Sequence, residues 1–223
     1  MAAHQRKLGL KVSTSNLCSE IMLHTGKDHL GNDRTAVCCL SSINAEKWFE
    51  WKDDPLFIED VMRFLDNVLE DFITRAPAAM EKAVYSARRE RSVGLGLMGF
   101  HSFLQQIGVP FESAMAKSWN LKLFKHIRMG ADAASVKLAE ERGPCPDAAE
   151  AGMKQRFSHK LAIAPPASIS IICGGCSPRT HSGQCLHAQD AVGLLQREER
   201  RAAEAPRRKR SRYGGCVDLD PRT

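Results

Sequence analysis

Three side chains whose types suit shared chemistry lie within the segment Asn16-Leu-Cys-Ser-Glu20. Alternate side chains of an extended segment or loop tip point the same way, so the amide, the thiol and the carboxylate could enter one pocket. An amide can hold two hydroxyls, a carboxylate can take a proton from one of them, and a thiol can do one- or two-electron chemistry. The competing interpretation is that Asn16 caps a turn and Cys18 is a small buried hydrophobe. The spacing alone leaves both interpretations open.

Length and composition predict one domain, or one piece of a larger one, because 223 residues that are 43% hydrophobic can bury a substantial core. The eight cysteines are irregularly spaced, and the N-terminal residues lead into no apolar segment of a secretory signal. No apolar run approaches the roughly 18 residues that a membrane span needs. We therefore expect a cytoplasmic protein with free thiols and no membrane contact.

The net charge of +6 is unevenly distributed. Residues 179–223 carry ten basic and six acidic side chains, which leaves the first 178 residues with a balance of only +2. A nearly neutral body gives no electrostatic reason to expect nucleic-acid binding.

Thr35–Ile43 is a short apolar run that predicts a buried strand, in which Cys38 and Cys39 must face opposite ways. Only one of these two thiols could therefore share a pocket with Cys18. The aromatic residues at 48, 49 and 51 predict a covered loop or turn after this strand.

Helical periodicity dominates the middle of the chain. The strongest pattern spans Phe57–Arg75, with acidic residues near its N-terminus and Pro77 after its end. Further helices are predicted over residues 78–91, 112–142 and 148–157.

Gly94, Gly96 and Gly99 form a G-x-G-x-x-G pattern before an amphipathic run to Gln106. Such a pattern can bind a dinucleotide pyrophosphate at a helix N-terminus. Here no second apolar strand ending in an acidic residue follows within a βαβ-sized unit. Close packing of the backbone explains the glycines better.

Residues 160–173 predict a strand, then a turn stiffened by Pro165 and Pro166, then more apolar chain. The small and hydroxylated residues of this turn suit phosphate oxygens, although an ordinary serine-rich turn explains them equally well. Cys173 and Cys176 have redox or zinc spacing, but no second pair completes a metal site, so we expect no bound metal.

Beyond Pro178 the alternating strand and helix patterns stop, and arginine-rich polar sequence follows. A basic arm for nucleic acid or membrane is one interpretation, and solvated disorder is the other. We assign residues 1–178 to the folded part and residues 179–223 to a basic, disordered tail.

Four motifs stand in the order found in the large (alpha) subunit of aerobic ribonucleotide reductase, and the resemblance runs from about Gln5 to Ser177. They are Asn16-Leu-Cys-Ser-Glu20, Ala36-Val-Cys-Cys-Leu-Ser-Ser42, Arg89-Glu-Arg-Ser-Val-Gly-Leu-Gly-Leu-Met-Gly-Phe-His101 and Ala164-Pro-Pro-Ala-Ser-Ile-Ser170. The resemblance implies an α/β fold, here an incomplete, helix-rich piece of a ten-stranded α/β barrel. In that barrel a central finger loop carries the catalytic thiol.

The resemblance also implies a role for each matching residue. Cys18 would be the thiyl radical that removes the 3′ hydrogen of the substrate ribose, and Glu20 the base on the 3′ hydroxyl. Asn16, with Ser15 beside it, would hold the ribose hydroxyls. Cys38 would be half of the dithiol that reduces the 2′ position. The substrate phosphates would lie on the loop of Pro165, Pro166, Ala167, Ser168 and Ile169, although relatives usually have a hydroxyl residue where Pro166 stands.

The partners implied by the resemblance are a second alpha chain and a metal-bearing small (beta) subunit that supplies the radical. Asn-Leu-Cys rather than Asn-Pro-Cys favours this radical source over cobalamin. A thioredoxin- or glutaredoxin-type protein would be the reductant, the substrate would be a ribonucleoside diphosphate, and no cofactor would be bound by this chain. The ATP and deoxynucleotide effector sites, the partner of Cys38 and the tyrosine pair of the radical path match nothing in this sequence.

We therefore interpret the chain as a central piece of a ribonucleotide reductase alpha subunit with an aberrant tail, and expect the chain alone to be inactive. A non-catalytic remnant is the first alternative. A nicotinamide-dependent oxidoreductase that uses the glycines at 94–99 is the second.

Overall fold

The structure is a computed structural model that describes residues 3–16 and 18–174. The tail that we predicted over residues 179–223, together with Cys176, lies outside these residues. In chain order the described elements are α1 (Ala3–Lys7), β1 (Gly26–Lys27), β2 (Asp33–Arg34), β3 (Leu40–Asn44), η1 (Ala45–Lys47), α2 (Trp48–Trp51), α3 (Phe57–Arg75), η2 (Ala78–Met80), α4 (Glu81–Glu90), β4 (Gly94–Met98), α5 (Phe100–Gln106), α6 (Ala114–Arg142), α7 (Pro146–Glu150) and α8 (Ala167–Ile172).

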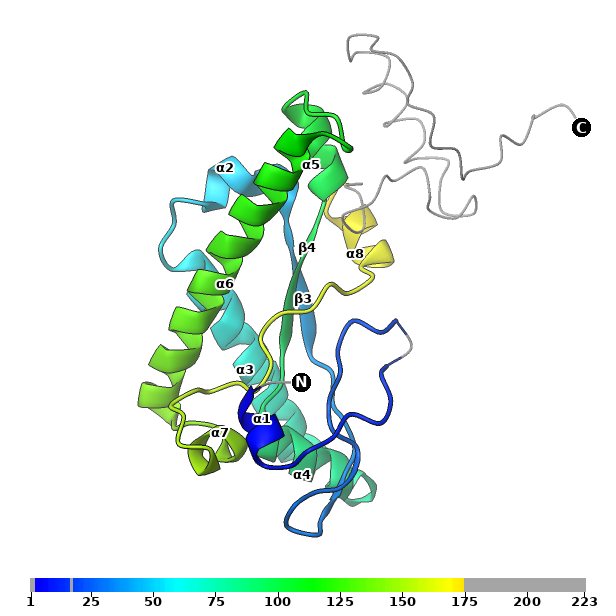
Figure 1. Cartoon of the computed structure of the whole chain (residues 1–223), viewed down its shortest axis with the longest axis vertical. Helices are drawn as coiled ribbons and strands as arrows, with labels where there is room; N and C mark the ends of the chain where they lie inside the picture. Colours follow the sequence, from blue (N-terminus) through cyan, green and yellow to red (C-terminus); the bar gives the residue numbers. More distant parts are fainter. Residues whose placement is uncertain (1–2, 17, 175–223) are drawn as a thin grey trace, which may run out of the picture.

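The centre of the fold is a parallel pair of strands, β3 and β4 (Figure 1). Their register runs from Leu40 opposite Gly94 to Asn44 opposite Met98, and α3 and α4 form the crossover between them. A parallel bridge between Leu95 and Leu161 adds a third segment beside β4. The fold is therefore α/β and helix-rich, as predicted, and the described residues contain no closed barrel.

Two long helices, α3 and α6, cover one face of this strand pair (Figure 1). The strands send Ile43, Leu95 and Leu97 into that face, where period two places alternate side chains on the same side. On α3 the buried residues recur at helical spacing, at Ile58, Met62, Leu65, Leu69 and Ile73. This face holds the main apolar core of the described residues.

The opposite face of the strands has a smaller core. Gly94 and Gly96 face the chain segment around Ala162, which crosses directly over β4. A Cβ atom on Gly96 would lie 2.3 Å from the carbonyl oxygen of Ala162, so only glycine fits there. Beside this crossing, Ile21, Leu23 and Ala162 form a separate cluster with Leu40 against it.

Two networks of buried ion pairs join the helices. Asp66 of α3 is fully buried and accepts hydrogen bonds from Arg91, Arg142 and Arg156 at 2.7–3.0 Å. Burial would raise the pKa of Asp66, but its bonds and charge interactions with Arg156 and Arg91 outweigh burial and lower it. The network therefore ties α3 to the start of β4, the end of α6 and the segment after α7.

The second network is centred on Asp147. Arg34 of β2 donates two hydrogen bonds to Asp147 of α7, at 2.6 and 2.9 Å, and a third to Asp28 at 2.9 Å. Arg89 of α4 bonds the same Asp147, as well as Glu150. The β1–β2 hairpin is thereby fixed to α4 and α7, and the two arginines share three carboxylates, Asp28, Asp147 and Glu150.

The predicted helix at Phe57–Arg75 is confirmed to the residue, and that at 112–142 is confirmed as α6. The strand predicted over Thr35–Ile43 was placed too early, because β3 spans Leu40–Asn44 and its partner begins only at Gly94. The helix predicted over 148–157 was also wrong in its bounds. That helix is α7, Pro146–Glu150, and Gly152 follows it with a positive φ of 74°.

One further sequence prediction was wrong, and one segment had been given no secondary structure. The aromatic residues after β3 form helical turns, η1 and α2, rather than a loop, because Trp48 and Trp51 both turn into the core. The apolar chain after the proline pair, for which we predicted neither helix nor strand, is the helix α8. A short apolar run fits either period, so its sequence could not decide between them.

Candidate active site

The segment that carries Asn16, Cys18 and Glu20 is a loop without regular secondary structure. Asn16 closes it in two ways: its carbonyl oxygen accepts a 3.0 Å bond from the amide of Ser19, and its side-chain Oδ1 accepts a 3.3 Å bond from the amide of Ile21. Ser19 has a left-handed φ of 56°, and its hydroxyl lies 3.1 Å from that of Ser15. The loop tip is thus a tight turn around residue 18.

The two interpretations of this segment each hold in part. Asn16 does close a turn, as the structural interpretation required. Cys18 is exposed, however, and is not a small buried hydrophobe. A free thiol at the tip of a tight turn is available to a substrate or to a partner.

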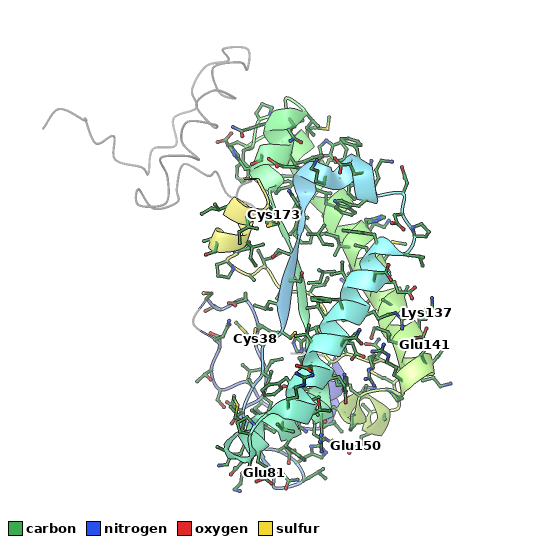
Figure 2. The ribbon with its side chains drawn as sticks, turned by 180° about the vertical axis from the view of Figure 1, so that it is seen from behind. Cys38, Glu81, Lys137, Glu141, Glu150 and Cys173 are labelled. Carbon is green, nitrogen blue, oxygen red and sulfur yellow. The ribbon has the colours of Figure 1, made fainter. Side chains whose placement is uncertain are left out.

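Glu20 and Cys38 come together from different elements. Cys38 lies just before β3, two residues ahead of Leu40, which packs against the small apolar cluster, and Figure 2 labels its position near the start of the strand. Cys38 is exposed, yet desolvation by the atoms around its thiol raises its pKa to about 11, with the negative charge of Glu20 as the next cause and Cys39 as a smaller one. One carboxylate oxygen of Glu20, Oε2, is buried and has no hydrogen-bond partner among the described residues.

Cys39 points the other way. Its thiol lies 3.8 Å from the carbonyl oxygen of Leu65 on α3, and its side chain packs against the main core. Burial raises its pKa as well. Cys39 thus packs on the helical side, whereas the pKa of Cys38 responds to the charge of Glu20. Because β3 begins only at Leu40, the placing of the two cysteines on opposite faces of one strand stays a prediction.

The residues expected to hold phosphate lie at the start of α8. Pro166 is buried and precedes the helix, with its carbonyl oxygen accepting a 2.8 Å bond from Ser170, whereas Pro165 and the first helical residues, Ala167, Ser168 and Ile169, are exposed. The amides of a first helical turn have no carbonyl one turn earlier to bond. Both figures show α8 and the loop on the side of the strands away from α3 and α6.

The dinucleotide interpretation of the glycine pattern is wrong for this chain. Gly94 and Gly96 lie inside β4 rather than in a turn after it, and the crossing segment at Ala162 occupies the space beside them. Gly99 alone precedes a helix, the seven-residue α5, with a positive φ of 74°. In the described part of the chain the glycines serve backbone packing.

The other candidate sites from the sequence have less structural support. Cys173 is exposed at the end of α8, and Cys176, its partner in the C-x-x-C pattern, is not among the described residues. Within residues 3–16 and 18–174 no group of three or more histidine, cysteine or acidic side chains could hold a metal ion. None of the helices in that same part is long and apolar enough to cross a membrane.

Sequence motifs did not identify every residue that organises this site. His24 bonds both limbs of the loop at its base, and it stands in no motif. The buried ion-pair partners of Asp66 and Arg34 could not be predicted from the sequence either, because charged residues far apart in the chain share no sequence pattern. Only the helical periodicity that brings α3 and α6 together could have suggested them.

Comparison with known proteins places this geometry in context. Residues 2–155 match the family described as "Ribonucleotide reductase, barrel domain". The ribonucleoside-diphosphate reductase large subunit of Invertebrate iridescent virus 3 is 46% identical over 189 residues, which cover 84% of this chain and 29% of the viral protein. The corresponding subunit of Invertebrate iridescent virus 6 is 48% identical over 161 residues, which cover 72% and 16%.

A solved structure, the class Id ribonucleotide reductase alpha subunit of Actinobacillus ureae, superposes with a TM-score of 0.75 at 32% identity. The match covers 89% of this chain and 38% of the solved chain. The present chain thus spans less than a third of the two viral relatives and well under half of the solved subunit.

Proposed function

The chain belongs to the family of ribonucleotide reductase barrel domains, and on this premise we propose that it carries residues that reduce ribonucleoside diphosphates to deoxyribonucleoside diphosphates. The observation that carries the proposal is the meeting of Glu20 and Cys38 on the face of the strands that also bears the Cys18 loop and α8. This arrangement brings an acceptor, a protonated thiol and an exposed thiol to one side of the molecule.

Cys18 has the role of the radical. A small subunit with a metal centre supplies the oxidising equivalent in the proposed assembly, and Cys18 then removes the 3′ hydrogen atom of the ribose, becoming a thiol again. The exposed position of Cys18 at a tight turn supports this role, because the sulfur must reach both substrate and radical source.

Glu20 and Cys38 have complementary proton roles. The unpartnered Oε2 of Glu20 accepts the proton of the 3′ hydroxyl, while Cys38 gives its proton to the departing 2′ hydroxyl, which leaves as water. A pKa near 11 supports this assignment, since it keeps Cys38 a thiol with a proton to give at neutral pH. Reduction at the 2′ position then takes two electrons from Cys38 and a second thiol, which become a disulfide that an external dithiol protein reduces.

Asn16 and α8 hold the substrate. The amide NH₂ of Asn16 remains for the ribose hydroxyls, because its Oδ1 is engaged by Ile21. The first-turn amides of α8 and Ser168 receive the phosphates, with Ala167 and Ile169 beside them, and Pro166 contributes no backbone donor.

A chimera tests the proposal. Residues 5–177 replace the matching segment of the iridescent virus 3 large subunit, and release of tritium from 3′-labelled nucleoside diphosphate is measured with the viral small subunit and a dithiol reductant. We expect release that falls to background in Cys18→Ala, and that is kept in Cys145→Ala, a buried cysteine that bonds Ser158. Equal release from the Cys18→Ala chimera, or none from a folded chimera, would overturn the proposal.

The separate chain is the second test. In the described residues β3 has one strand neighbour, so the sheet around the site is open. We expect no tritium release from the chain by itself above that of its Cys18→Ala variant. Release above that control would show that it is an enzyme in its own right, and the alternative of a non-catalytic remnant would then be wrong.

A further inference from the structure

His24 lies at the point where the loop that carries Asn16, Cys18 and Glu20 returns to the body of the fold. Its side chain is 5% exposed. Ring atom Nδ1 is 2.6 Å from the carbonyl oxygen and 3.1 Å from the amide nitrogen of Lys11, and Nε2 is 3.0 Å from the carbonyl oxygen of Lys27. One ring therefore contacts the chain just before the loop and the hairpin just after it.

The partners fix how the ring can bond. Nε2 faces a carbonyl oxygen and must donate to it. Nδ1 faces both backbone groups of Lys11: it accepts from the amide in a neutral ring whose proton is on Nε2, and it donates to the carbonyl in a doubly protonated ring. With either choice the ring remains bonded to Lys11, and a buried histidine with both nitrogens engaged is held in one orientation.

We propose that His24 is a positioning residue, which closes the base of the loop and thereby fixes where Glu20 stands relative to Cys38. The proposal deepens the function proposed above, because it concerns the placement of the residues assigned to that reaction. The tip of the loop is held by Asn16, and Ile21 and Leu23 anchor its return limb in the small apolar cluster. The limb before the tip, from Lys11 to Ser15, has its bond to the body at His24.

The thiol of Cys38 reports the position of Glu20 without any turnover. The charge of Glu20 helps to keep this thiol protonated, so displacement of Glu20 increases the thiolate fraction and the rate of alkylation at a fixed pH. The test is iodoacetamide labelling of the whole chain at pH 8, with the rate at Cys38 followed by peptide mass spectrometry. Glu20→Gln gives the rate expected when the charge is absent.

We expect His24→Ala to raise the Cys38 rate by at least half of the increase in Glu20→Gln, roughly threefold or more if the pKa falls by half a unit. The double variant should match Glu20→Gln alone, because both changes act through one carboxylate. His24→Asn keeps an amide where Nδ1 stands and should restore the slower rate, whereas His24→Gln reaches only toward Lys27 and should not. His29→Gln, which alters an exposed histidine paired with Glu150, is the matched control and should leave the rate unchanged.

An unchanged rate in His24→Ala, or an increase that adds fully to that of Glu20→Gln, would overturn the proposal. Equal Cys38 labelling rates in the His24→Asn and His24→Gln variants would also overturn it. This pair of variants provides the test if His24→Ala does not fold. Amide exchange at α3 shows whether a change is confined to the loop. None of these readouts requires turnover, so failure of the chimera would count against the proposed reaction and not against the role of His24.

Discussion

The two faces of the β3–β4 pair are held by different forces. The helical body, α1, α3, α4, α6 and α7, combines the main apolar core with two buried ion-pair networks. The site side, residues 11–24 with Cys38 and α8, has a cluster of three buried apolar residues and a few single hydrogen bonds. The proposed site thus lies on the side with fewer buried apolar residues, as expected of segments that must admit a substrate.

Asp66→Ala should have the largest effect, because it leaves three arginines without their shared buried carboxylate. Removing one partner of a buried ion pair costs roughly 3–5 kcal/mol of unfolding free energy. Urea unfolding measures this loss, and Asp71→Ala on the same helix is the control, since its bond to Arg75 is exposed and should cost under about 0.5 kcal/mol. A loss below about 1 kcal/mol in Asp66→Ala would mean that the network does not hold the helical body together.

Truncating one buried leucine to alanine on each face tests the difference in packing between the two faces directly. Leu65→Ala, in the main core, should cost roughly 3–5 kcal/mol, whereas Leu23→Ala should cost nearer 2 kcal/mol, because a small cluster at the edge of the molecule can collapse around the gap. Both leucines are almost fully buried, so exposure does not confound the pair. Equal losses in urea unfolding would show that the site side is as firmly packed as the helical body.

The raised pKa of Glu90 predicts how the stability of the chain depends on pH. Burial raises its pKa to about 8, against partial opposition from Arg34 and from the hydrogen bond of Gln5. Between its ordinary value of 4.5 and pH 8 the folded chain therefore holds one proton more than the unfolded chain, so stability falls as pH rises. The slope approaches about 1.4 kcal/mol per pH unit, or roughly 2 kcal/mol between pH 6 and 7.5.

Glu90→Gln removes this slope. Gln5 Oε1 and Glu90 Oε1 are both buried without a hydrogen-bond partner among the described residues, and a protonated carboxyl or an amide at position 90 can donate back to Gln5. The variant should match the unchanged chain at pH 6 and exceed its stability at pH 8. Asp28 and Glu150, with pKa values of about 2, titrate outside this window. A slope that survives in Glu90→Gln would assign it to another group.

The helical body was also the part that its sequence predicted best. Ile58, Leu65 and Leu69 belong to an apolar pattern of helical period that runs along the whole segment, so α3 could be placed to the residue. On the site side such repetition is lacking. Residues 35–39 are as apolar as a strand, yet pairing starts only where Gly94 stands opposite Leu40, which no local pattern reveals.

The candidate site could be predicted in its residues but only partly in its geometry. Alternation predicted different surroundings for Cys38 and Cys39, although neither residue lies within β3. It could not predict that the Oδ1 of Asn16 accepts a hydrogen bond from the amide of Ile21, or that His24 bonds the base of the loop. These contacts depend on how a loop folds back on itself. The roles of Asn16, Cys18 and Glu20 remain predictions for the chimera to test.

The smallest expected effect concerns the loop tip. Asn16→Ala removes the acceptor for the amide of Ile21, a bond of 3.3 Å at a half-buried position, and should cost no more than about 1 kcal/mol in urea unfolding. Asn16→Asp keeps an acceptor oxygen there and should cost less, while both variants lose the amide NH₂ proposed to hold the ribose hydroxyls. We therefore expect amide exchange at Ile21 to quicken in the alanine variant and to stay slow in the aspartate variant, with α3 unaffected in both. If Asn16→Ala instead destabilised the chain as much as Leu65→Ala, the loop would be part of the framework, and the contrast between the two faces would be wrong.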